Sequence, residues 1–336
     1  MTTAAVSQAT PLPLEFPAGP IGQTSLASKA MLSSISIRVW PASKYDPNAT
    51  EEIALLHNAH KDAGRYNKKL VPRESLEELN KIAGEARQDH YFLTLPWSDE
   101  GFRVLPAATY MEHAQKMRGH LARFEPAISR FEAGFADLVT EQSREHSRLG
   151  TLFNIDDYPG MHLQENGKMV LLSPQKLRSR FSFETKVMPL PDASDFRVSL
   201  GEEDRQRIKR QIEASLQASL QIGTRDLWQR LYQVVRHMSD RLTEYNAMEK
   251  GKGRKLYDAW VSNIVEVVDV LPRLNITRDT ELERMASEIR ASLLVDPDDL
   301  RKSESACSET AKTALAIAER MAAYMGVPPA TAPGAA

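Results

Sequence analysis

The sequence predicts a mostly α-helical protein in which two long helices form an antiparallel coiled-coil hairpin, with a small β-containing tip and a helical base that carries a short N-terminal strand. Two apolar stripes predict the hairpin, because residues spaced alternately three and four apart form one face of a helix. The stripe within 107–149 contains Ala114, Met117, Leu121, Phe124, Ile128, Phe131, Phe135 and Leu138. The stripe within 202–249 contains Ile208, Ile212, Leu216, Leu220, Leu227, Leu231, Val234, Met238, Leu242 and Tyr245, and its spacing is close to heptad from Leu227 onward. Two helices with such faces pack most simply against each other.

The segment 150–201 between the two helices predicts the tip. A connection of this length inside a compact protein usually carries structure of its own. Strand-like runs occur at 169–172, 181–183 and 196–198. We therefore place a small β-containing tip at the far end of the hairpin. Pro126 lies inside the first helix and predicts a kink there, because proline removes one helical hydrogen bond.

The base is predicted from residues 31–106 and 250–325. Ile35, Ile37 and Val39 alternate with polar residues, which predicts a short strand with one buried face. Helices are predicted at about 46–64, 72–90, 256–271, 279–294 and 298–325 from their apolar periodicity, Pro and Asp starts, and Gly or Pro stops. The apolar side of the first of these consists of Ile53, Leu55, Leu56 and Ala59. The leader 1–30 and the tail 326–336 lack apolar periodicity, so we expect both to be disordered.

Composition limits the classes of function. The 43 Lys and Arg residues nearly balance 45 Asp and Glu residues, which gives a net charge of -2. A protein dedicated to duplex DNA is usually more basic. The single cysteine, Cys307, excludes an intrachain disulfide and a cysteine-based zinc site. No apolar run approaches the roughly 18 residues of a membrane span. These features predict a cytoplasmic protein without a membrane segment.

Two basic segments are candidate binding sites for single-stranded nucleic acid. The first mixes cations with aromatic residues, an arrangement that can follow a phosphate backbone and stack bases; it contains Lys176, Arg178, Arg180, Phe181 and Phe183. The second is a glycine-containing loop with Lys250, Lys252, Arg254 and Lys255. Each has a simpler interpretation. The first segment is also typical of an amphipathic strand with its two Phe side chains inward, and the second of a solvated turn near a helix C-terminus.

Catalytic and metal sites have weaker support. Glu85 and His90 lie just before the Trp97 loop and form a conceivable acid–base pair, but a helix-end cluster of ion pairs is the favoured interpretation. The pairs His57/His60 and His113/His120 each share a helical face, but neither has a third ligand at a recognisable spacing. No nucleotide-binding, hydrolase or zinc motif is present. We therefore expect neither a cofactor nor a metal.

Three short segments carry a family resemblance: Leu93-Thr94-Leu95-Pro96-Trp97, Leu149–Asn154 followed by Asp157-Tyr158-Pro159, and Asp195-Phe196-Arg197-Val198. Together they resemble an uncharacterised family of bacteriophage and mobile-element proteins whose members often lie beside a MoxR-type AAA+ ATPase and a von Willebrand A-type protein. The resemblance covers most of residues 35–325 and transfers no catalytic residue. It implies a phage or mobile-element accessory protein.

These observations favour a non-enzymatic interaction or scaffold protein that presents its tip on a helical stalk to a protein partner, for which the resemblance suggests an AAA+ ATPase. The alternative is a protein that binds single-stranded nucleic acid through the two basic segments. An enzyme with its site near Trp97 is a third hypothesis. The heptad stripes are also compatible with a homo-oligomer, because the same side chains can pack against a second chain.

Overall fold

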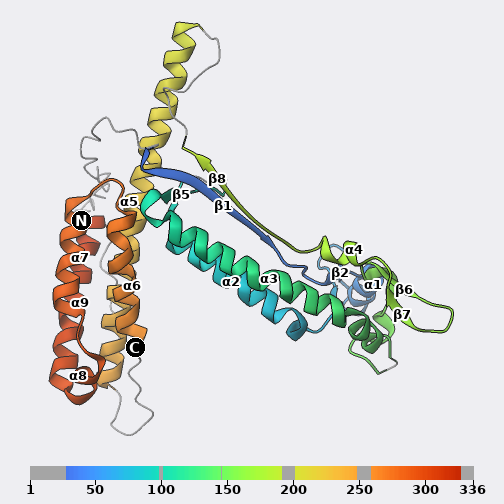
Figure 1. Ribbon diagram of the computed structural model, residues 1–336. Helices are drawn as coiled ribbons and strands as arrows, with labels where there is room; N and C mark the ends of the chain where they lie inside the picture. The colour runs from blue at the N-terminus through green and yellow to red at the C-terminus, as the bar shows by residue number, and fades with distance from the viewer. Residues whose placement is uncertain (1–27, 98–100, 145, 191–200, 248–258, 327–336) are drawn as a thin grey trace, which may run out of the picture. The chain divides into compact units, whose positions relative to one another are not determined.

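The computed structural model describes residues 28–97, 101–144, 146–190, 201–247 and 259–326 (Figure 1). The chain is mostly helical with a small antiparallel sheet. It divides into two compact units. Unit 1 comprises residues up to Ser33, Leu93–Tyr110 and Val187–Ala336, and unit 2 comprises Ser34–Phe92 and Met111–Lys186. None of the described helices is both long enough and apolar enough to cross a membrane.

The sheet has the strand order β4-β5-β1-β8. β1 (Ala30–Arg38) is the predicted N-terminal strand, extended by five residues before Ile35, and β8 is Ser182–Pro189. In unit 1, β1 pairs antiparallel with β5 (Arg103–Pro106), which also pairs with the short β4 (Leu95–Pro96). The two long strands β1 and β8 each continue into unit 2.

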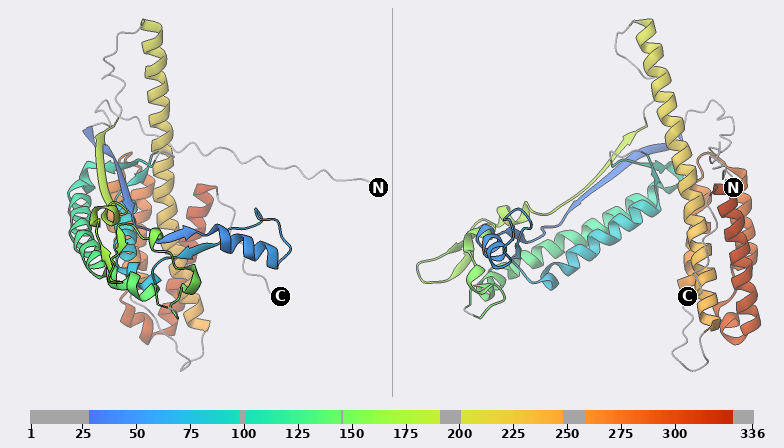
Figure 2. Two further views of the ribbon diagram at one scale, coloured as in Figure 1. Left: turned by 90° about the vertical axis from the view of Figure 1, so that its right-hand side faces the viewer. Right: turned by 180° about the vertical axis from the view of Figure 1, so that it is seen from behind.

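Unit 1 is built mainly from helices. These are the 46-residue α5 (Glu202–Ala247), α6 (Ala259–Leu274), α7 (Thr280–Leu293), α8 (Pro297–Lys302) and α9 (Glu304–Met325). α5 packs along α6 and α9, and α7 packs against both α6 and α9 (Figure 2). The core comes from buried faces of these helices and includes Leu231, Met238, Ile264, Ile289 and Ile317. The first part of α5 extends beyond the other helices of this unit.

α6 continues through Pro272, where the sequence predicted its end. Proline has no N–H and cannot donate to the carbonyl four residues earlier. For Pro272 this is the carbonyl of Val268. Arg290 of α7 supplies a donor instead, with its Nη2 3.4 Å from the Val268 oxygen and 2.7 Å from Asp269 Oδ1. The unmade bond is thereby replaced from a neighbouring helix, and α6 reaches Leu274.

Unit 2 is organised around α2 (Glu77–Phe92) and the 36-residue α3 (Ala107–Gln142), which lie side by side in every view. The smaller elements are α1 (Pro47–Leu56), β2 (Ser43–Tyr45), β3 (Asn67–Lys69), the 3-10 turns η2 (Arg73–Leu76), η3 (Gly150–Leu152) and η4 (Ile155–Asp157), β6 (Met161–Leu163), β7 (Met169–Leu171) and α4 (Pro174–Arg178). α1, β2, β6, β7 and α4 gather at one end of the α2–α3 pair (Figure 1).

The two predicted stripes are buried in different units. The stripe on α3 packs within unit 2, where Phe131 and Phe135 make edge-on contacts with Trp40 and Phe124 is fully buried. The stripe on α5 from Leu220 onward is buried in unit 1. The long helices are therefore present, but a coiled-coil hairpin between them is not confirmed. Heptad spacing reveals that a helix has an apolar face, not which element covers it.

Candidate functional site

One end of unit 2, formed by residues 43–72 and 148–181 and called the distal end below, brings together segments that the sequence analysis assigned to the base and to the tip. A buried ion cluster joins them. Lys68 of β3 is only 6% exposed; its Nζ lies 3.0 Å from Asp46 Oδ2 and 2.8 Å from Asp157 Oδ2, and it donates to the Leu152 carbonyl at 2.7 Å. A buried ammonium requires such partners, because desolvating an unpaired charge is costly.

The electrostatics of this cluster follow from its contacts. Burial lowers the pKa of Lys68, but the hydrogen bonds and charges of Asp157 and Asp46 outweigh burial and leave that pKa raised. The pKa of Asp46 is lowered, first by the Ala49 amide, which Asp46 caps at the start of α1, and then by Lys68. Asp46 thus holds α1 and Lys68 together. A second tie is the Tyr158 hydroxyl, which donates to the Leu70 carbonyl at 2.8 Å and whose pKa burial raises to about 12.

α1 presents apolar side chains to solvent. Ile53, Leu55 and Leu56 are 45%, 73% and 80% exposed, whereas the sequence analysis placed them on the apolar side of a packed helix. The side that does pack is formed by Ala49 and Thr50. α1 ends at Leu56 because Asn58 adopts a left-handed conformation, with φ +47°, which terminates helices. The sequence had predicted that this helix continues to Gly64.

A pocket of about 270 Å³ lies beside α1. Its apolar part includes Ile53, Ala54 and the ring of Tyr66, and its basic side chains are His57, His60, Lys61 and Arg65. Among the residues that the structure describes, no carboxylate lines it; Asp62 lies next to it and pairs with His60. Arg65 also stacks over the ring of Tyr45 at 5.7 Å. The lining therefore combines apolar side chains with these basic ones, which are called the basic rim below.

A second hollow, the tip groove, measures about 510 Å³. It is lined by Asp156, Tyr158, Pro159, Gly160, Met161, His162, Leu172, Ser173, Lys176, Ser179 and Arg180. Gly160 shapes its wall: with φ +79°, its carbonyl accepts from the amides of Leu172 and Ser173, and a Cβ here would lie 2.3 Å from the Ser173 oxygen. Only glycine fits this close approach.

The groove contains two of the predicted nucleic-acid-binding cations, Lys176 and Arg180. The third, Arg178, has its guanidinium 2.5 Å from Glu125 Oε2 and 3.4 Å from Glu132 Oε2 on α3. The sequence analysis expected these residues to form one strand, and this is wrong. Lys176 and Arg178 lie in α4, which begins at Pro174, a residue suited to the first position of a helix.

The two predicted aromatic residues face the core. Phe181 is buried, with its ring 5.7 Å from that of Phe131, and Phe183 packs on Phe124 at the same centroid distance. In this conformation neither ring is placed to stack on a base. The second candidate segment, with Lys250, Lys252, Arg254 and Lys255, lies outside the described residues, as do 1–27 of the predicted leader and 327–336 of the predicted tail.

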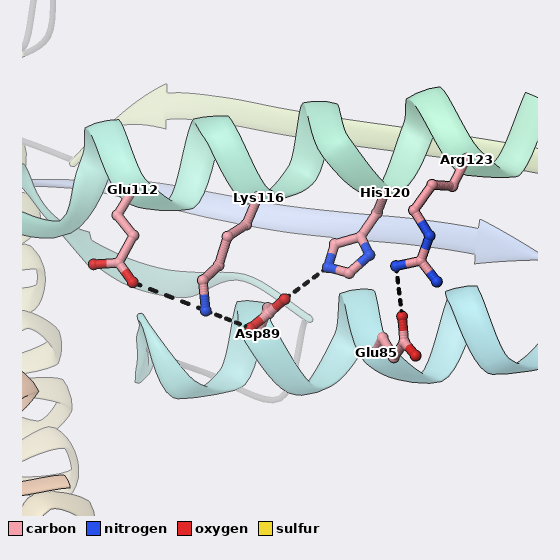
Figure 3. Close-up of polar contacts among 6 residues, drawn as sticks. All are labelled: Glu85, Asp89, Glu112, Lys116, His120 and Arg123. Atoms are coloured by element: carbon pink, nitrogen blue, oxygen red, sulfur yellow. Dashed lines mark hydrogen bonds and ion pairs between the residues drawn. The ribbon is translucent and has the colours of Figure 1, made fainter. Parts of the chain in front are cut away.

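Of the proposed pair Glu85 and His90, Glu85 belongs to a polar ladder between α2 and α3 (Figure 3). Asp89 accepts from Lys116 Nζ at 2.7 Å and from His120 Nε2 at 2.6 Å, and Glu85 Oε2 pairs with Arg123 Nη1 at 2.7 Å. Burial raises the pKa of Asp89, but Lys116 and His120 outweigh it and leave that pKa lowered. The ladder thus joins two helices, which is the simpler of the two predicted roles.

His90 lies deeper and bonds to His113, with 2.9 Å between Nδ1 and Nε2. Both are nearly inaccessible, and burial lowers the pKa of His113 although Asp89 opposes this. Glu85 and His90 therefore have different partners. In the described part of the chain, no group of three or more His, Cys, Asp or Glu side chains is arranged to hold a metal ion.

No protein-family model, curated protein or solved structure matches the chain. The geometry of the distal end is therefore the basis for a proposed function. Sequence reasoning missed Lys68, Asp46 and Asp157, because no motif links residues so far apart in the chain. It also missed the basic rim of the α1 pocket. Asn58 was a usable signal there, because asparagine often ends a helix and would have shortened the predicted one.

Proposed function

We propose that this chain is a non-enzymatic interaction protein that binds a protein partner through the apolar pocket beside α1. The observation that carries the proposal is that Ile53, which is 45% exposed, lines a pocket of about 270 Å³, and that Leu55 and Leu56 of the same helix are exposed as well. Single exposed apolar side chains are ordinary, but a group of them beside a concave surface is typical of an interaction site. Burying a fully exposed Leu or Ile side chain contributes about 1.5–3 kcal/mol of apolar transfer free energy, and each of these side chains would contribute a part of that in proportion to its exposed fraction.

The charges around the pocket indicate the chemistry of the partner. Lys61, Arg65 and the two histidines are its basic side chains. Complementary charge guides association and selects partners more than it adds affinity. We therefore infer that the occupant is a segment of another protein with an apolar side chain flanked by Asp or Glu. A basic segment would be repelled at the rim.

The surroundings of the pocket support binding without large rearrangement. α1 is capped by Asp46, which is fixed through Lys68 to Asp157. The Thr50 hydroxyl further accepts from the Tyr66 amide at 3.0 Å, which closes the chain around the pocket. A site held in place before binding loses less conformational entropy on association. In this proposal α2 and α3 support the distal end; the predicted hairpin of 107–149 with 202–249 stays a prediction.

A displayed random-peptide library selected on the immobilised full chain tests the proposal. We expect enriched peptides to combine apolar residues with Asp or Glu. Their binding should weaken at least tenfold in the variant Ile53→Asp/Leu56→Asp and in Lys61→Glu/Arg65→Glu. The control Met111→Asp/Ile222→Asp changes two other exposed apolar residues and should bind normally. Enriched peptides that are basic, or that bind all variants equally, would refute the proposed site.

The family resemblance names the first protein partner to test, a MoxR-type AAA+ ATPase. Mixing the purified ATPase with the wild-type chain and with Ile53→Asp/Leu56→Asp, followed by size-exclusion chromatography with light scattering, would show whether the two form a complex. The proposal predicts co-elution with the wild-type chain alone. An ATPase that co-elutes with both would bind elsewhere on the chain.

A further inference from the structure

The tip groove is separate from the α1 pocket, and its lining has a different character. The two hollows share no lining residue. Its charged lining consists of two cations, Lys176 and Arg180, and one carboxylate, Asp156, and the hydroxyl-bearing Ser173 and Ser179 also line it. The balance of fixed charge along this lining is therefore positive, which favours an anionic ligand.

The cations of this groove are available for a ligand. Within the described part of the chain, neither the Lys176 ammonium nor the Arg180 guanidinium forms a hydrogen bond or an ion pair. Arg178, between them in sequence, shows the contrast, since Glu125 and Glu132 already neutralise it. The local sequence thus places three cations within five residues, and the fold engages only the middle one.

The size and the remaining lining narrow the ligand class. A hollow of about 510 Å³ lies in the range typical of small-ligand sites and is too large for a phosphate ion alone. Arg and Lys are suited to phosphate oxygens, the first as a two-pronged donor and the second as a point charge. Pro159, Met161 and Leu172 add apolar surface next to these cations. The lining therefore suits a phosphate attached to a less polar body.

We propose that the tip groove binds a nucleotide unit, with its phosphate between Lys176 and Arg180 and its base or sugar against Met161 and Leu172. The unit could be a free nucleotide or part of a single strand, since both present the same chemistry. Phe181 and Phe183 do not take part, because both pack in the core. The proposal is independent of the protein-binding site beside α1.

Fluorescence anisotropy of the full chain tests this with two probes, a labelled oligothymidylate strand and a labelled adenine mononucleotide, at low and near-physiological salt. The variant Lys176→Glu/Arg180→Glu should weaken binding at least tenfold and make its salt dependence shallower, because two phosphate contacts are removed. Both side chains are exposed, so folding should be unaffected, which thermal unfolding checks. The control Lys81→Glu/Arg118→Glu makes the same charge change at two other exposed positions of unit 2 and should bind as the wild type does.

The outcomes separate the two sources of the ligand. Binding of the mononucleotide, with competition between the two probes, would identify a nucleotide site; binding of the strand alone would identify a single-strand site. The absence of binding by the wild-type chain at low salt would overturn the proposal. Strand binding that is equal in wild type, test variant and control would also overturn it and direct attention to Lys250–Lys255.

Discussion

Lys68 of β3 and Asp157 of η4 form an ion pair of 2.8 Å in the interior of the distal end. This pair ties the β2–β3 hairpin, and α1 between its strands, to the segment that follows α3. Asp46 completes the cluster from the other side at 3.0 Å. The proposed binding surface therefore depends on three charged residues that are far apart in the sequence.

Replacing Lys68 with Met should loosen the whole distal end. Both carboxylates would lose their buried cation, and removing one partner of such a cluster typically costs about 3–5 kcal/mol. Hydrogen exchange over residues 43–72 and 148–181 should accelerate together. Lys69→Met, at the exposed neighbouring position, is the control and should change stability by no more than about 0.5 kcal/mol. Faster exchange confined to β3 would show that the cluster does not couple the two segments.

His113 should make the protein less stable as the pH falls below neutrality. Burial lowers its pKa in the folded state below the ordinary value of 6.5, while Asp89 opposes this weakly. Between 6.5 and the lowered value, the unfolded chain therefore binds more protons than the folded chain, so stability decreases with decreasing pH. Urea unfolding of His113→Gln between pH 7 and pH 5 should show a flatter dependence than the wild type. Parallel curves would contradict this.

The ionised carboxylate of Asp89 should stabilise the folded protein, and this contribution should be lost at lower pH than that of His113. Its pKa is lowered from 3.8, since the hydrogen bonds of Lys116 and His120 outweigh burial. A lowered carboxyl pKa gives stability that is present above the unfolded value and is lost as the pH falls through the folded value. Asp89→Asn should therefore be less stable than wild type at pH 7, and the difference should shrink below about pH 4. A difference that stays constant down to pH 2.5 would exclude an ionic role.

Truncation should destabilise the protein far more in the α3 stripe than on the α1 surface. Phe135 is fully buried against Trp40 and Tyr158, so Phe135→Ala should cost about 3–5 kcal/mol. Leu56→Ala at an exposed position should cost less than about 0.5 kcal/mol. Chemical denaturation measures both. A large loss of stability in Leu56→Ala would indicate that α1 is packed, and would leave the proposed binding surface without its main support.

The sequence predicted the elements better than their partners. β1 follows from the alternation of Ile35, Ile37 and Val39, and the long helices α3 and α5 follow from their apolar stripes. The shorter α7 follows from its start at the Asp279 cap. Local capping and periodicity depend on neighbours along the chain, so they are readable from sequence. Which element packs on the apolar face of a given helix depends on residues far away in the chain. The predicted hairpin of the two stripes is a statement of this kind, and it remains unconfirmed.

The candidate site shows the same limit. Lys176 and Arg180 were selected from their charge, and the structure places both in one groove. The engagement of Arg178 by Glu125 and Glu132 on α3 could not be predicted, because it depends on how α4 lies against that helix. Pro174 suits the first turn of a helix and is a local signal for α4 that the prediction of a strand here did not use.

Hydrogen–deuterium exchange of the full chain, alone and saturated with a selected acidic–apolar peptide, tests the central claim most directly. The account predicts slower exchange of backbone amides within residues 47–66, which form α1 and the chain around its pocket. The same peptide should produce no protection in Ile53→Asp/Leu56→Asp. Protection confined to α6–α9, or unchanged protection in that variant, would contradict the assignment of the binding surface to α1.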